Sequence, residues 1–153
     1  MSIAKRLAED MKQALKAKET RRLNCIRMLR SKLQEKTVEL RAKHGPEHEL
    51  TDDEAVEVIG AYAKQRRDSI SAYREAGREE QAADEQAELD IVTAYLPEQL
   101  TDEALRQIVK EAVASSGAVS AKDIGAVMKI VMPQVKGRAD GKQVNAIARE
   151  LLG

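Results

Sequence analysis

Apolar residues recur every three or four positions through most of this chain, which is the spacing of an amphipathic α-helix. They occupy every fourth position from Ile3 to Leu15, and come at steps of three and four from Leu23 to Leu40. The composition agrees, because the chain has no Trp or Phe and only three Tyr residues, and Ala, Leu, Glu, Lys, Arg and Gln dominate it. These features predict an all-α protein.

Capping residues and helix breakers divide the chain into seven expected helices. Pro97 is expected to end the fourth helix, which is placed at about residues 78–95, because proline biases the preceding residue away from helical dihedrals. We therefore expect a helical N-terminal domain of about four helices at residues 1–96, and a small C-terminal three-helix domain at 97–153. The inward-facing residues expected for the first helix are Ile3, Leu7, Met11 and Leu15, and those expected for the last are Val144, Ile147, Ala148 and Leu151.

The C-terminal domain carries the clearest start and stop signals. Ser120 is expected to begin the sixth helix, and Pro133 should kink that helix or end it early, because proline removes a backbone donor. The seventh helix is expected from Gly141 to Leu152.

Charge is unevenly distributed along a chain whose formal net charge is zero. Residues 1–43 carry 13 Lys and Arg against 5 Asp and Glu, whereas residues 44–96 carry 5 against 14. Two interpretations stay open. Either the basic helices pack beside the acidic ones and each relieves the other, which is the more ordinary arrangement, or the first two helices form a nucleic-acid surface.

The stretch KGRADGK near the C-terminus crowds two glycines and three cations between two expected helices. Gly137 is expected to end one helix in a left-handed conformation, and Asp140 to cap the next, with Gln143 completing a capping box. Because Asp140 would occupy the backbone amides that a phosphate needs, a glycine cradle for phosphate is the less favoured interpretation.

The side chains around this stretch form a candidate phosphate-binding surface. At 100° per residue, Lys122, Lys129 and Lys136 are expected to form one stripe on the sixth helix. A ridge of this kind would contact a phosphate backbone without reading bases, although a solvated face is the more ordinary interpretation of the pattern alone. The candidate nucleic-acid-binding residues are Lys129, Lys136, Arg138, Lys142, Asn145 and Arg149.

No catalytic or metal-binding constellation is found in the sequence. Cys25 lies among apolar neighbours without a nearby histidine, so an inert thiol is expected. His44 and His48 flank a turn, where two imidazoles do not complete a metal site. We expect no catalytic residue, no cofactor and no metal.

The N-terminal stretch lacks the apolar core of a signal peptide, and no run approaches the roughly 18 apolar residues of a membrane span. A cytoplasmic protein with no membrane partner is therefore expected.

The stretches YLPEQLTDE and IGAVMKIVMPQVKGRADGKQVNAIARELL resemble the GatB/YqeY family, and in particular its free-standing YqeY-type members. The resemblance covers the whole chain for YqeY-like proteins, but only the tail of GatB, a subunit of the glutamine-dependent tRNA amidotransferase. It implies an all-helical fold and, by likeness to that tail, contact with tRNA. The family label of carbon–nitrogen ligase with glutamine as amido donor describes the parent complex.

Three functions follow from the residues and this resemblance. The first is a non-catalytic tRNA-binding accessory module. The second is a protein-interaction module that docks on an aminoacyl-tRNA synthetase or amidotransferase subunit. The third is an enzyme in its own right, as a glutamine-dependent amidotransferase component.

Overall fold

The computed structural model describes residues 1–153, which fold into seven α-helices and one short 3-10 helix. The protein is all-α, as the sequence predicted. The helices form two compact units, Met1–Pro97 and Glu98–Gly153.

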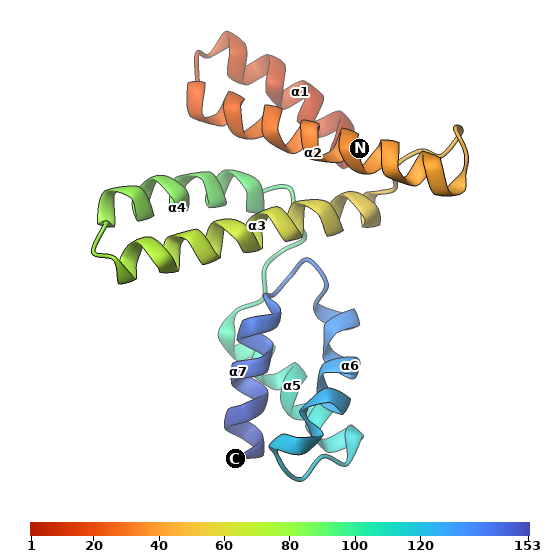
Figure 1. Cartoon of the computed structure of the whole chain (residues 1–153), viewed down its shortest axis with the longest axis vertical. Coiled ribbons are helices and arrows are strands. Elements are labelled where there is room, and N and C mark those ends of the chain that lie inside the picture. The colour runs from red at the N-terminus through yellow and green to blue at the C-terminus, as the bar shows by residue number, and fades with distance from the viewer. The chain divides into compact units, whose positions relative to one another are not determined.

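The first unit consists of two helical hairpins (Figure 1). The first pairs α1 (Ile3–Lys16) with α2 (Thr20–His44), and the second pairs α3 (Asp52–Glu75) with α4 (Glu79–Thr93). Their apolar faces meet in one core, in which Leu7, Ile26 and Ile59 are fully buried.

Local signals set where these helices begin and end. The Ser2 hydroxyl accepts a hydrogen bond from the Lys5 amide and caps α1. Thr51 and Glu54 form the capping box expected at the start of α3. Gly45 follows α2 with φ 108° and ψ 159°, a conformation outside the left-handed helical region expected for it but open to glycine.

Leu15 does not face the core as predicted. Its side chain is 59% exposed, whereas Ala14 is fully buried. Each four-residue step advances about 40° around a helix, so Leu15 lies roughly 120° from Ile3, while Ala14 lies only about 20° from it. A strict four-residue spacing therefore drifts off the buried face within three steps.

The second unit is a three-helix bundle of α5 (Asp102–Ser116), α6 (Ile124–Val135) and α7 (Gly141–Leu152), with the 3-10 helix η1 (Ala121–Asp123) leading into α6 (Figure 1). Its core contains the fully buried Leu105, Val109, Val127, Val131, Val135, Val144 and Ala148. Pro133 lies inside α6, which ends two residues later. Leu151, predicted to face the core, is 43% exposed, whereas Leu152 packs against the core.

Candidate nucleic-acid interface

The six predicted binding residues lie on α6, on α7 and on the connection between these helices, all within the second unit. We refer to them together as the basic ridge, which consists of Lys129, Lys136, Arg138, Lys142, Asn145 and Arg149. Four of the six side chains, those of Lys129, Lys136, Lys142 and Arg149, belong to exposed residues.

The predicted lysine stripe on α6 is wrong. Lys122 lies in η1 rather than in α6, and Lys136 follows the last residue of α6 with φ −51° and ψ 120°. The 100° step holds only within one continuous α-helix. Of the three lysines, Lys129 alone projects from α6.

The connection between α6 and α7 is bonded to the segment that precedes α5. The Gln99 side chain donates from Nε2 to the Gly137 carbonyl at 2.7 Å, and the Leu100 amide donates to the Arg138 carbonyl at 2.9 Å. In the opposite direction, Arg138 donates from Nε to the Glu98 carbonyl at 3.2 Å. We call these three hydrogen bonds the clasp.

The clasp assigns Arg138 a structural role that the sequence did not reveal. Its Nε is bonded to a carbonyl oxygen, so only the terminal nitrogens of the guanidinium remain for another ligand. Gln99 is a second residue that sequence reasoning missed. Local sequence rules do not pair segments that are 38 positions apart. The one signal in the sequence was that Gln99 and Gly137 both lie in the stretches that carry the family resemblance.

Gly137 and Asp140 end one helix and cap the next as predicted, but Gln143 does not complete the expected capping box. Gly137 has φ 74°, in the left-handed region that favours glycine. The Asp140 carboxylate accepts a hydrogen bond from the Lys142 amide at 3.2 Å and so caps α7. An acidic group is already bonded to the amide that a phosphate would need, which argues against a glycine cradle.

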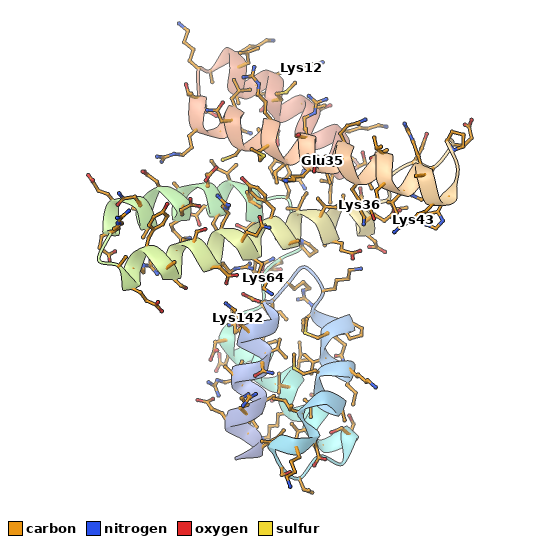
Figure 2. All side chains as sticks on the ribbon, viewed as in Figure 1. Lys12, Glu35, Lys36, Lys43, Lys64 and Lys142 are labelled. Atoms are coloured by element: carbon orange, nitrogen blue, oxygen red, sulfur yellow. The ribbon has the colours of Figure 1, made fainter.

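The α7 part of the ridge is ordered by one internal contact. Arg149 donates from Nε to the Asn145 side-chain oxygen at 2.8 Å, four residues earlier on the same face. Lys142 lies in the first turn of α7 (Figure 2) and is about 10 Å from Arg149 along the helix axis. Arg149 and Lys142 thus present two cations along one helix.

The acid next to Arg149 is already paired. Glu150 accepts a hydrogen bond from Arg106 at 2.7 Å, and Arg106 also bonds Asp102 at 2.8 Å. The hydrogen bond to Asp102, followed by that to Glu150, raises the pKa of Arg106 above its ordinary value. Arg106 therefore compensates the charge of Glu150, which would otherwise weaken an anion site at Arg149.

The one thiol of the chain is buried, as predicted. Cys25 is 1% exposed, and its Sγ–H donates to the Glu88 carboxylate at 3.5 Å. Burial, followed by the charge of Glu88, raises the pKa of Cys25 to about 12. At neutral pH the sulfur is a thiol and not the nucleophilic thiolate.

The two histidines do not assemble a metal site. His48 Nε2 lies 3.0 Å from Oε2 of Glu54, and the ring centroids of His44 and His48 are 5.4 Å apart. No group of three or more His, Cys, Asp or Glu side chains gathers in an arrangement suited to a metal ion. None of the helices combines the length and apolar character that crossing a membrane requires.

Comparison with known proteins gives one family for nearly the whole chain. The model of the family described as Yqey-like protein matches residues 4–152. A Pyrenophora tritici-repentis protein, "Altered inheritance of mitochondria protein 41, mitochondrial", is 31% identical over 152 residues, covering 97% of this chain and 80% of the relative. The Saccharomyces cerevisiae protein of the same name is 31% identical over 90 residues, covering 59% of this chain and 46% of the relative.

These relatives contradict the cytoplasmic location predicted from the sequence. Both are named as mitochondrial proteins, which points to the mitochondrion rather than the cytoplasm. The prediction rested on the lack of a signal peptide and of a membrane span. Neither feature distinguishes a cytoplasmic protein from a protein inside the mitochondrion, so the inference had no physical basis for choosing between them.

Proposed function

Because the chain belongs to the YqeY-like protein family, we propose that it is a tRNA-binding accessory module without catalytic activity of its own. The basic ridge would contact the phosphate backbone of tRNA. The observation that carries this proposal is the pair of exposed cations on α7, Lys142 and Arg149, on a helix whose start is fixed by the Asp140 cap.

Preorganisation supports a binding role for this surface. The clasp holds the connection before α7, and Asn145 orients the Arg149 guanidinium, so little side-chain freedom is lost when a phosphate binds. A guanidinium suits phosphate because it presents several N–H donors in one plane. The Cys25 thiol, protonated and buried, supports a non-catalytic role.

A salt series with unfractionated tRNA tests the proposal. Replacing Lys142 and Arg149 together by Ala should weaken binding and reduce the magnitude of the log-affinity versus log-salt slope by roughly 0.7 to 0.9 per lost phosphate contact. The matched control replaces Lys110 and Lys122 by Ala, which removes the same charge from exposed positions outside the ridge.

Circular dichroism should show that both double variants remain folded. If the two variants bind tRNA with the same affinity and the same salt slope, the ridge is a solvated face and the assignment of tRNA binding to the ridge fails. Binding to an aminoacyl-tRNA synthetase or amidotransferase subunit would then be the function to test.

A further inference from the structure

Three lysines share the outer face of α1. Lys5, Lys12 and Lys16 fall within about 40° of one another around the helix axis. The opposite face carries Leu7 and Ala14, which are fully buried in the core of the first unit. Lys12 accordingly points away from α3 and α4 in Figure 2. We call Lys5, Lys12 and Lys16 the lysine face.

The three lysines of this face are not paired with neighbouring acids. None of its three side chains forms an ion pair or a hydrogen bond. The lysines of α2 differ, because Lys36 and Lys43 both bond Glu39 at 3.2 Å. Lys32 is similarly placed 3.8 Å from Glu35.

This difference bears on the two interpretations of the basic N-terminal segment. The two helical hairpins compensate each other's charge where Arg21 pairs with Asp84 at 2.9 Å. It does not extend to α1, where the three lysines stay unpaired and the one acid among them is the exposed Glu9. The excess of positive charge on α1 is therefore presented to solvent.

A fourth exposed lysine, Lys18, follows α1 in a backbone conformation that carries an energetic cost. Lys18, in the turn between α1 and α2, has φ 58°, and it is the one residue other than glycine with positive φ. That conformation costs an ordinary side chain about 1 kcal/mol or more relative to glycine. A lysine thus occupies a position where glycine would be more stable, and its side chain is exposed.

The chemistry of this face fits phosphate better than a protein or a lipid surface. Protein interfaces are built around apolar and aromatic anchors and are depleted of lysine. Insertion into a membrane interface needs a free apolar face, whereas the apolar face of α1 is buried in the core. Successive lysines are about 6 and 10 Å apart along the axis, close to or within one Debye length, so their potentials reinforce one another.

We propose that the lysine face binds the phosphate backbone of RNA as a contact surface separate from the basic ridge. The inference rests on the proposed function in taking RNA as the ligand. It assigns that ligand to three lysines of α1, which lie outside the two stretches that carry the family resemblance.

The test compares two variants that remove the same charge. One replaces Lys5, Lys12 and Lys16 by Gln, and the control replaces the paired Lys32, Lys36 and Lys43 by Gln. Binding of unfractionated tRNA to the full chain is measured over a salt series. The lysine-face variant should reduce the magnitude of the log–log slope by roughly 0.7 to 0.9 for each lysine that contacts phosphate, and the control should change it much less.

A variant expected to strengthen tRNA binding gives a second test. Replacing Glu9 by Gln removes the one acid of the face, so it should strengthen tRNA binding at low salt while the protein stays folded. Unchanged or weaker binding by this variant would contradict a phosphate surface on α1.

The ridge variant, with Lys142 and Arg149 replaced by Ala, separates this inference from the proposed function. If the ridge variant weakens tRNA binding and the lysine-face variant matches its control, the lysine face is not a site and the proposed function stands. If only the lysine-face variant weakens binding, the ridge is not the site and the inference on α1 holds. Absence of tRNA binding by the unmodified chain, or lysine-dependent binding to anionic phospholipid vesicles alone, overturns the inference.

Discussion

The Tyr95 hydroxyl donates a 2.5 Å hydrogen bond to Oδ2 of Asp10, which lies 85 positions earlier in the chain. Tyr95 is 4% exposed and follows α4, whereas Asp10 lies in the middle of α1. The Arg6 guanidinium lies 5.2 Å from the centre of the Tyr95 ring. This contact attaches the end of the second hairpin of the first unit to the first helix of the first hairpin.

Replacing Tyr95 by Phe should lower the free energy of unfolding at pH 7 by about 2 kcal/mol, because a hydrogen bond to a carboxylate is lost while the ring remains. Asp10 keeps its ion pair with Arg22 at 3.6 Å, so the carboxylate is not left alone. Urea unfolding followed by circular dichroism measures the change. Equal midpoints for the two proteins would show that this bond contributes nothing net.

We expect Tyr95 to cause a loss of stability at alkaline pH. Burial, and then the bond to Asp10, raises the pKa of Tyr95, so the folded state holds the phenolic proton more tightly than the unfolded chain does. Its contribution is fully present below about pH 10 and is lost as the pH rises through the folded pKa. The free energy of unfolding should be measured at pH 7 and above pH 10 for both proteins. Its decrease between the two pH values should be smaller for the Tyr95→Phe variant than for the unmodified chain. Burial also raises the pKa of Tyr62, which is present in both proteins and therefore contributes to the alkaline loss of each.

Cys25 should resist alkylation in the folded protein. Its sulfur is buried and protonated at neutral pH, and a thiol-specific reagent needs an accessible thiolate. Iodoacetamide labelling at pH 8, followed by mass spectrometry, should be slow without denaturant and complete in urea. Fast labelling under native conditions would mean that α2 and α4 separate readily at this position.

Replacing Gln99 by Ala should destabilise the second unit by about 1 to 3 kcal/mol, because the Gly137 carbonyl loses its side-chain donor. The matched control is Gln107→Ala, which removes a 3.1 Å bond to Glu111 on the exposed face of α5. In chemical denaturation, the Gln99→Ala variant should unfold at a clearly lower denaturant concentration than this control. The clasp would have no measurable role if the two variants unfolded at the same denaturant concentration.

Asp140 should behave as a helix cap and not as a ligand. Asp140→Ala should cost about 1 kcal/mol of stability, whereas Asp140→Asn keeps a side-chain oxygen for the Lys142 amide and should cost little. If tRNA binds the ridge, Asp140→Asn should also hold or raise the affinity, because a repulsive charge is removed. A fall in tRNA affinity in the still-folded Asn variant would assign the carboxylate a direct binding role.

Most helix positions could be predicted from the sequence because they depend on local chemistry. Hydroxyl and carboxylate side chains at Ser2, Thr51, Thr101 and Asp140 cap helices through bonds spanning only two or three residues. Gly77, Gly117 and Gly137 end or follow helices with positive φ, because glycine adopts that conformation at little cost. The all-α fold and the bounds of α7 follow from such rules together with the apolar period.

Tertiary structure decided what depends on contacts between distant segments. The clasp joins Gln99 to Gly137, and no local pattern encodes that pairing or the resulting restraint on Arg138. The pattern likewise placed Lys136 on a helix that ends one residue before it. The sequence determines the helical periodicity, and therefore which residues share a face of a helix. It does not determine which cations on that face remain unpaired, as on α1. That depends on where the acids of other turns and helices lie in the folded protein.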